Sequence, residues 1–296
     1  MSNNRFVDVA VVLLVLVSSA PWLPAAEAKE IEVERDIEYC VHDDVKLAAD
    51  IYRPPGKGPF PGVLVVHGGA WMSGNRNQLA MVARELAQAD YVAVAISYRL
   101  APQHLFPAQI DDCREAVRWM RRTSQKWKID PQHIGGYGYS AGGHLVSLLG
   151  TASDEAEAKR GIPSARLQAV VAGGAPLDFR LLPANARILA YWLGGSRSEK
   201  PEIYLQASPA AFVSGDDPPC YFFHGEKDAL VPVLSPVGMD ILLKAAGVSS
   251  QVHKVAGAGH IQTLFNTEAR EHAIEFLDQV LKRRTADASS SEGEGR

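Results

Sequence analysis

The chain has 296 residues, of which 47% are hydrophobic and 22% charged, and its formal net charge is −4 at pH 7. That composition is ordinary for a globular protein, and the length suits one large α/β domain with a sizeable core. The charge is small and no basic stripe with interleaved aromatic residues occurs, so a nucleic-acid partner is not expected.

The first 28 residues have the pattern of a secretory signal peptide. Arg5 and the amino terminus supply positive charge, Val9 to Val17 form an apolar run, and Ala26-Glu27-Ala28 offers a small-x-small cleavage site. A membrane anchor is the alternative, but nine unbroken apolar residues are too few to span a bilayer. We therefore expect a secreted or periplasmic protein that starts at Lys29 after cleavage and does not stay inserted in a membrane.

Beyond residue 28, stretches with strand-like patterns alternate with stretches that have helical patterns. Residues 31–39 and 46–52 are expected to pair as antiparallel strands at one edge of a sheet. Further strands are expected at 62–66, 92–96, 134–137, 167–172, 220–224 and 251–255. Helices are expected at 78–89, 108–126, 236–246 and 267–282, with another beginning at 143. This alternation predicts an α/β fold with a mostly parallel central sheet and helices on both faces.

One long connection, residues 178–219, interrupts that alternation. It exceeds a simple helical crossover, and we expect a helix at 184–193 and a further turn or two at 203–212. The segment is predicted to form a cap-like insert within a single domain at 29–284, which a disordered tail at 285–296 follows. An insert of this length leaves no room for a large separate lid.

The sequence Gly138-Tyr139-Ser140-Ala141-Gly142 is a G-x-S-x-G segment between a predicted strand and a predicted helix. A strand, a sharp turn and a helix hold the turn residue in a strained conformation, with its side chain exposed above the sheet. The flanking glycines remove side chains that would clash in so tight a turn. Free N–H groups of the following helix face any negative charge that develops beside Ser140. The motif alone recurs by chance, and it is this context that makes Ser140 a candidate nucleophile.

The strand at 62–66 ends in His67-Gly68-Gly69-Ala70-Trp71. Glycines at a strand end let the backbone fold back toward a ligand and aim its N–H groups at a carbonyl oxygen. An ordinary glycine turn is the alternative, and the later serine motif favours the oxyanion-hole interpretation. His67 is expected to brace this loop through hydrogen bonds rather than to act as a base.

A serine hydroxyl needs a base to take its proton and a third group to orient that base. Asp228 follows the strand at 220–224, and His260 follows the strand at 251–255 after a run of small residues. These positions give the chain order Ser, Asp, His that hydrolases of this kind use. Asp178, after an earlier strand, is a competing acid, and Asp228 is preferred over it.

Together these segments resemble the α/β-hydrolase carboxylesterases, and most closely a branch of bacterial feruloyl-esterase-like and acetylxylan-esterase-like proteins related to the hormone-sensitive-lipase type. The resemblance covers residues 31–283 and rests on His67-Gly68-Gly69-Ala70-Trp71, Ser97-Tyr98-Arg99-Leu100-Ala101-Pro102, Phe106-Pro107-Ala108-Gln109, Gly138 to His144, Ala207-Ser208-Pro209 and His224-Gly225-Glu226-Lys227-Asp228. Two positions differ from the hormone-sensitive-lipase pattern, because Ala70 replaces a third glycine and Gln103 replaces the usual Glu after Ala-Pro.

The resemblance implies an α/β-hydrolase fold and a serine esterase that works by acyl transfer without a cofactor. It assigns the catalytic roles in chain order to nucleophile Ser140, acid Asp228 and base His260. The oxyanion donors that it implies are backbone N–H groups, of Gly68 or Gly69 and of Ala141. The expected substrates are short-chain or carbohydrate-linked esters of acetyl or feruloyl type.

Candidate walls of the substrate pocket are three aromatic residues near the motifs and in the insert, namely Trp71, Tyr139 and Trp192. A peptidase or amidase of the prolyl-oligopeptidase type uses the same turn and chain order, but it usually carries an additional propeller domain, for which 296 residues leave no room. A non-catalytic binding protein of this fold would be marked by loss of one catalytic residue, and all three are present. The sequence leaves the oligomeric state open.

Cys40, Cys113 and Cys220 make an odd count, and three unpaired thiols are expected. No H-E-x-x-H or C-x-x-C pattern occurs, so no metal site is expected. The partners expected are therefore small-molecule or polysaccharide-linked esters.

Overall fold

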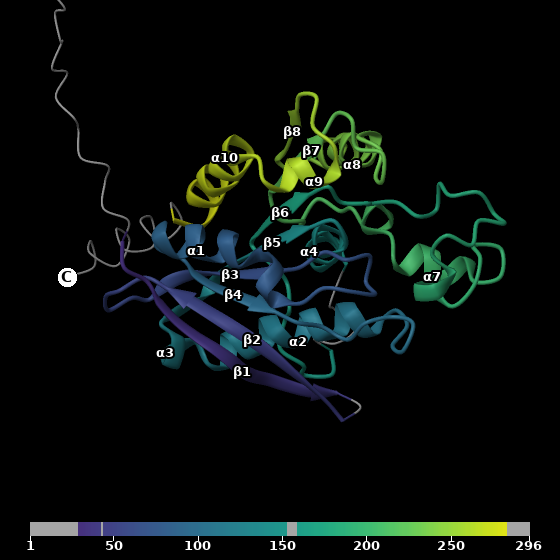
Figure 1. Ribbon diagram of the computed structural model, residues 1–296. Helices are drawn as coiled ribbons and strands as arrows, with labels where there is room; N and C mark the ends of the chain where they lie inside the picture. The colour runs from purple at the N-terminus through teal and green to yellow at the C-terminus, as the bar shows by residue number, and fades with distance from the viewer. Residues whose placement is uncertain (1–28, 43, 153–158, 283–296) are drawn as a thin grey trace, which may run out of the picture.

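A computed structural model describes residues 29–42, 44–152 and 159–282. Its eight strands form one sheet, in the order β1-β2-β4-β3-β5-β6-β7-β8 (Figure 1). The predicted signal peptide at 1–28 and the predicted tail at 285–296 lie outside the described residues. Both stay predictions, as does the division into one domain with a cap-like insert.

The strands have these bounds: β1 Glu32–His42, β2 Val45–Arg53, β3 Phe60–Val66, β4 Val92–Ile96, β5 Ile129–Tyr139, β6 Ala169–Gly173, β7 Cys220–Gly225 and β8 Ser250–Val255. β1 with β2 and β2 with β4 pair antiparallel, and all other pairs are parallel. The predicted edge pair and the predicted fold class are confirmed. β5 begins earlier than expected because Ile129 and Asp130 already pair with Phe60 and Pro61 of β3.

The helices and short helical turns have these bounds: η1 Arg76–Leu79, α1 Ala80–Gln88, α2 Ala108–Arg122, α3 Ser124–Trp127, α4 Ala141–Thr151, α6 Ala190–Leu193, α7 Pro201–Gln206, η2 Pro209–Ala211, α8 Leu234–Ala245, α9 His260–Leu264, α10 Thr267–Leu277 and η3 Asp278–Lys282. Within the described ranges, no helix has both the length and the hydropathy needed to cross a membrane. The three cysteines are free thiols, as expected.

The core lies in two layers, one on each face of the sheet. β3 shows why, because its apolar residues alternate between the layers: Leu64 and Val66 pack with α2, α4 and α8, whereas Val63 and Val65 pack with α1 and α10. Strands buried on both faces need apolar side chains at nearly every position. The two helical layers therefore cover opposite faces of one sheet (Figure 1).

The helix expected at 184–193 is largely wrong, since only Ala190–Leu193 is helical. The carbonyl of Ala184 accepts a hydrogen bond from the backbone N–H of Ser198 at 2.8 Å. An α-helix starting at Ala184 would need that carbonyl for the residue four positions on. A tertiary contact thus replaces the first helical turn. The turns expected at 203–212 are confirmed, as α7 and η2.

Candidate active site

The site forms where the loops after the parallel strands meet at the carboxyl end of the sheet. Because parallel strands end at the same edge, the loops after β3, β5, β7 and β8 come together although they are far apart in sequence. The helices α4 and α9 begin at this edge (Figure 1). Side chains on these loops can therefore converge on a ligand.

Ser140 occupies the sharp turn between β5 and α4. Its backbone has φ 55° and ψ −120°, a region that costs a non-glycine residue about 1–3 kcal/mol. The N–H of Ser140 donates to the carbonyl of Gly173 at 2.7 Å, and its carbonyl accepts from the N–H of His144 at 2.9 Å. These hydrogen bonds hold the strained turn in one conformation, so the Ser140 side chain does not have to reorganise when a ligand binds.

Two glycines make this turn possible. A Cβ on Gly138 would lie 2.2 Å from the carbonyl oxygen of Gly142, and a Cβ on Gly142 would lie 1.9 Å from the carbonyl oxygen of Val66. Both clashes are with backbone, which cannot move aside as a flexible side chain can. Any larger residue at either position would therefore displace Ser140 or the end of β3.

Ser140, His260 and Asp228 form one continuous hydrogen-bonded chain. The Nε2 atom of His260 lies 3.0 Å from Oγ of Ser140, and its Nδ1 atom lies 2.6 Å from Oδ2 of Asp228. A carboxylate can only accept, so Nδ1 of the neutral ring carries the proton and Nε2 is left to accept from the serine. This arrangement can remove the serine proton during attack on a carbonyl carbon.

The carboxylate of Asp228 is buried and held from several sides. Its Oδ1 accepts from the backbone N–H groups of Leu230 and Val231, both at 2.9 Å. Nε2 of His224 lies 3.3 Å from Oδ2 of Asp228 and 2.8 Å from the carbonyl of Val231. That carbonyl can only accept, so Nε2 of His224 carries a proton, which it donates to Val231 while lying close to Oδ2 of Asp228. The carboxylate is therefore fixed while it orients His260.

The contact between His224 and Asp228 was not foreseen from the sequence. The two residues are four positions apart on a strand end and its loop, a spacing with no fixed geometry outside a helix. Burial lowers the pKa of His224, which keeps its ring neutral near pH 7. No sequence pattern would have identified this contact.

Asp178, the competing acid, is used elsewhere. Its carboxylate oxygens accept from Nε and Nη2 of Arg180 at 2.8 and 2.7 Å, and one of them also accepts from the backbone N–H of Arg180. No hydrogen bond joins it to His260 within the part of the chain that the structure describes. The structure thus brings Asp228, and not Asp178, to the histidine.

The loop after β3 lies directly against the serine. A Cβ on Gly68 would lie 3.3 Å from Cβ of Ser140, and Gly69 has φ 105° with its carbonyl accepting from Met72 and Ser73. No group in residues 29–42, 44–152 or 159–282 accepts a hydrogen bond from the N–H of Gly68 or Gly69. Together with the N–H of Ala141, at the first position of α4, these donors are free to receive a ligand oxygen.

His67 braces this loop. Its Nδ1 lies 2.7 Å from the carbonyl of Gly68, and its ring stacks on Tyr98 with centroids 4.2 Å apart. Burial lowers the pKa of His67 to about 4, so the ring is neutral near pH 7. It makes no hydrogen bond to Ser140 among the interactions of the described residues.

The three predicted pocket walls differ in their surroundings. Trp71 and Trp192 stack face to face with centroids 3.7 Å apart, and Trp192 has no exposed surface. Trp71 is itself only 4% exposed, so Trp192 has no surface and Trp71 little surface to offer a ligand, and their role as pocket walls stays a prediction. The hydroxyl of Tyr139 donates to the carbonyl of His260 and positions that residue.

His144 joins the serine turn to the segment between β6 and β7. Its Nδ1 accepts from the indole N–H of Trp71 at 3.2 Å, and its Nε2 donates to the carbonyl of Ala207 at 2.7 Å. The ring is fully buried, and burial lowers its pKa to about 4. This one side chain thus connects α4, the loop after β3 and the 174–219 segment.

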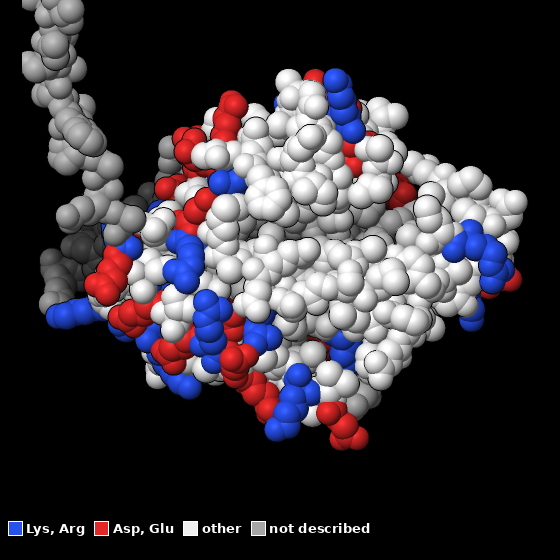
Figure 2. Space-filling view, in the orientation of Figure 1, with Lys and Arg blue, Asp and Glu red and all other residues white. Residues whose placement is uncertain are grey.

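The surface around these loops is largely apolar. Four large apolar side chains are 62–82% exposed on the loops and on helix α9 at this end of the sheet: Leu181, Ile188, Leu230 and Ile261. Figure 2 shows few Lys, Arg, Asp or Glu side chains on the face between α9 and α7. The surroundings suit an uncharged or partly apolar ligand better than a highly charged one.

Comparison with known proteins gives a consistent result. Residues 49–239 match the family described as BD-FAE. The chain is 34% identical over 248 residues to the probable carboxylic ester hydrolase LipM of Mycobacterium tuberculosis, an alignment that covers 78% of this chain and 57% of LipM. It spans 57–64% of the length of this and two similar curated relatives.

Solved structures show the same fold. A truncated carbohydrate esterase from gut microbiota superposes with a TM-score of 0.75 at 24% identity, covering 87% of this chain and 99% of that one. An esterase of Thermogutta terrifontis with bound butyrate superposes with a TM-score of 0.71 at 25% identity, covering 86% and 95%. The architecture is therefore shared over nearly the whole length of both structures.

Proposed function

The chain belongs to the BD-FAE family of α/β-hydrolases, and we propose that it is a serine carboxylic ester hydrolase acting by acyl transfer on short-chain or carbohydrate-linked esters. The observation that carries the proposal is the hydrogen-bonded chain from Ser140 through His260 to Asp228. Its three residues come from three separate loops, and their order along the chain is that of the α/β-hydrolases.

In the first half of the reaction Oγ of Ser140 attacks the ester carbonyl carbon while Nε2 of His260 takes the hydroxyl proton. The resulting imidazolium lies against the carboxylate of Asp228, which stabilises its charge. The tetrahedral intermediate collapses when His260 gives the proton to the leaving alkoxide. The products of this half are a free alcohol and an acyl group bound to Ser140.

In the second half a water molecule takes the place of the alcohol. Nε2 of His260 removes a proton from the water as its oxygen attacks the acyl carbon. Collapse of the second intermediate returns that proton to Ser140 and releases the carboxylic acid. Neither half contains a redox step, and the ester and water are the reactants, so the residues of the chain account for both halves.

The N–H groups of Gly68, Gly69 and Ala141 are proposed to hold the oxyanion of both intermediates. The N–H groups of Gly68 and Gly69 have no acceptor among the described residues, and preorganised donors of this kind are worth about 3–4 kcal/mol each in related hydrolases. Positive φ values at Gly69, Ala70 and Trp71 keep this loop in its folded-back form. The loop therefore stabilises charge without reorganising during the reaction.

Two observations support the proposed substrate class. The apolar side chains around the site favour an uncharged ester, and the Thermogutta terrifontis esterase of similar fold has butyrate bound. A carbohydrate ester is supported by family membership and by the gut-microbiota carbohydrate esterase of the same fold. An acetyl or feruloyl ester of a sugar is both uncharged and linked to a carbohydrate.

The test is a substrate panel with the purified enzyme and Ser140→Ala as the matched control. The panel contains nitrophenyl acetate and butyrate, acetyl-xylan, methyl ferulate and a nitroanilide of the same acyl group. The proposal expects ester hydrolysis that the variant lacks, with the nitroanilide far slower. Faster cleavage of the anilide would identify an amidase instead, and no hydrolysis of any substrate would leave a binding protein.

We also propose that the chain is exported, with residues 1–28 removed. The support is the sequence pattern described above, since these residues lie outside the described structure. Expression of the full chain in a bacterial host with cell fractionation tests this. A mature protein that starts at Lys29 outside the cytoplasm is expected, and a cytoplasmic protein that keeps residues 1–28 would contradict the proposal.

A further inference from the structure

A cluster of metal-ligating side chains lies away from the serine, between the edge strand β8 and the helix α10. It consists of His253 on β8 and of Glu268 and His272 on α10, and their ligand atoms all lie within 4.8 Å of one another. The two imidazole rings meet edge to face, with centroids 5.2 Å apart. None of these three residues belongs to the hydrogen-bonded chain of Ser140, His260 and Asp228.

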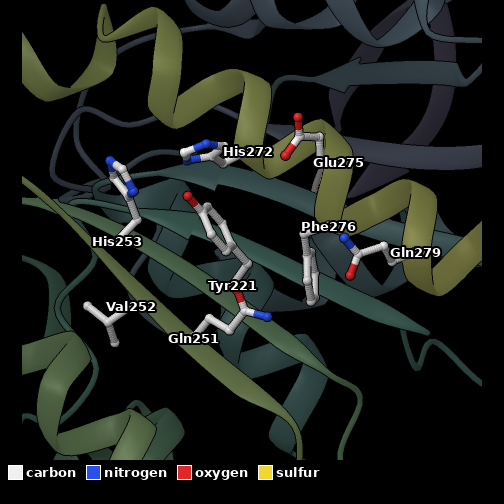
Figure 3. A pocket seen from close by; sticks show the side chains of 8 residues that line it. All are labelled: Tyr221, Gln251, Val252, His253, His272, Glu275, Phe276 and Gln279. Carbon is white, nitrogen blue, oxygen red and sulfur yellow. The ribbon is translucent and has the colours of Figure 1, made fainter.

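The local structure explains why these side chains converge. Glu268 and His272 are four residues apart on α10 and so lie on one helix face, one turn apart. On β8, Gln251 and His253 lie on the same side of the strand, because side chains alternate between faces. Both residues line a pocket together with His272, so this side of β8 faces α10 (Figure 3).

A second observation at the same place is an unpartnered hydroxyl. Tyr221 on β7 is only 3% exposed, and its hydroxyl finds no hydrogen-bond partner among the residues that the structure describes. In Figure 3 this hydroxyl points toward the space between His253 and His272. An unsatisfied buried hydroxyl costs about 1–3 kcal/mol, and a polar group opposite it would remove that cost.

The electrostatics of the pocket favour a cation. Burial, and then the carboxylates of Glu268 and Glu275, raise the pKa of Tyr221, so it keeps its proton and can donate near pH 7. Glu275 also lines the pocket. Glu275 and the two imidazoles line this space, and the carboxylate of Glu268 lies within 4.8 Å of both imidazoles, so the cluster provides negative charge and lone pairs.

We propose that His253, Glu268 and His272 bind one divalent transition-metal ion of the zinc type. Two imidazoles and a carboxylate are a donor set that zinc prefers, and a water in the fourth position would accept the hydrogen bond of Tyr221. Ligand atoms of a tetrahedral zinc site lie about 3.3–3.6 Å apart. To close from 4.8 Å, the ligand atoms must move by about 1–2 Å, and rotation of the exposed Glu268 side chain can provide this movement.

The bound ion would fasten α10 to the edge of the sheet. Among the described strands β8 pairs with β7 alone, so it forms one edge of the sheet. An ion that binds only the folded protein raises its free energy of unfolding. The gain grows with the logarithm of the ion concentration divided by the dissociation constant. No compact metal-binding motif marks the site in the sequence, because its ligands come from a strand and a helix.

The experiment uses the full chain, produced without a polyhistidine tag and stripped with a chelator. Zn²⁺ is titrated by calorimetry, Co²⁺ by its visible absorption, and the melting temperature is measured with and without Zn²⁺. We expect one ion per chain, a four-coordinate Co²⁺ spectrum and a higher melting temperature with Zn²⁺. No stoichiometric binding, or no change in melting temperature, would overturn the proposal.

Variants identify the ligands. His253→Ala, His272→Ala and Glu268→Gln should each weaken Zn²⁺ binding by about tenfold or more, and Tyr221→Phe by less. Glu268 is exposed, so Glu268→Gln tests the site without threatening the fold. The matched control is His42→Ala, at the end of β1 on the opposite edge of the sheet, which should bind as wild type does. Equal binding by all variants, or equal loss in His42→Ala, would contradict the assignment.

Discussion

Ser140 lies between two regions whose shapes are determined in different ways. On one side the turn from β5 to α4 is fixed by its own backbone, with glycine Cβ positions that would lie 1.9–2.2 Å from carbonyl oxygens. On the other side the 174–219 segment contains only short helices, α6, α7 and η2. The first region depends on residues close in sequence or on the sheet itself, and the second depends on distant side chains.

The contacts of the 174–219 segment show this dependence. Trp192 stacks on Trp71, Ala207 accepts from His144, and the hydroxyl of Tyr191 donates to the carbonyl of Ala70. Each contact joins the segment to the loops around the serine. The turn is thus held by its own backbone and by the sheet, whereas the segment is held by contacts between residues far apart in the sequence.

The largest effect is expected from removing the nucleophile. Ser140→Ala should lower ester turnover roughly 10⁵- to 10⁶-fold, as in other serine hydrolases, while the melting temperature stays close to that of wild type. Alanine also carries a Cβ, so the strained backbone is unchanged. Turnover and thermal melting of the two proteins provide the check, and appreciable turnover by the variant would place the nucleophile elsewhere.

The acid residues compare the two regions directly. Asp228→Asn should lower kcat roughly 10⁴-fold, because the amide favours the wrong tautomer of His260. Asp178→Asn is the matched control within the 174–219 segment, and it should be much milder because Asp178 pairs with Arg180. Rates for both variants on one nitrophenyl ester are the measurement. The opposite ranking would mean that the 174–219 segment supplies the acid.

Stability at low pH tests the contacts between the regions. The pKa values of His67 and His144 are lowered from 6.5 to about 4 by burial, so between these values the unfolded chain binds more protons than the folded one. The free energy of unfolding should therefore fall as pH drops from 6.5 toward 4, by about 3 kcal/mol for each histidine. A free energy of unfolding that falls only above pH 6.5 would contradict this prediction.

His144→Gln isolates one of these two contributions. Glutamine can hydrogen-bond but does not titrate, so the variant should lose about half of the histidine-dependent part of the acid effect. Urea unfolding at pH 7 and pH 4.5, on wild type and variant, gives the comparison. An identical pH dependence in the two proteins would show that His144 is not held neutral in the folded state.

The smallest effect concerns acyl length, which the 174–219 segment should control. A pocket closed by a few fixed side chains gains little from methylenes that stay in water, so kcat/KM should be highest for short acyl groups. Acetate, butyrate, octanoate and palmitate esters, with and without an emulsion surface, test this. Best activity on palmitate, or a rise in rate when droplets form, would favour a lipase with a mobile cover.

These regions also show what the sequence could predict. The alternation of apolar strands and helices predicted the sheet, and β4 has the expected bounds of Val92–Ile96. The serine turn was predictable because its glycines stand two residues before and two after Ser140, and the turn requires both, Gly138 by its contact with Gly142 and Gly142 by its contact with Val66 of β3. The helix at 184–193 failed because the carbonyl of Ala184 bonds to Ser198, and the contact of His224 with Asp228 has no sequence pattern.

The most direct test of the account is covalent labelling of the serine. Wild type and Ser140→Ala are treated with a fluorophosphonate, which reacts with activated serines, and the labelled site is read from peptides by mass spectrometry. The account predicts one label per chain, on Ser140, and none on the variant. A label on another serine, or undiminished labelling of Ser140→Ala, would contradict the claim that the strained turn between β5 and α4 carries the nucleophile.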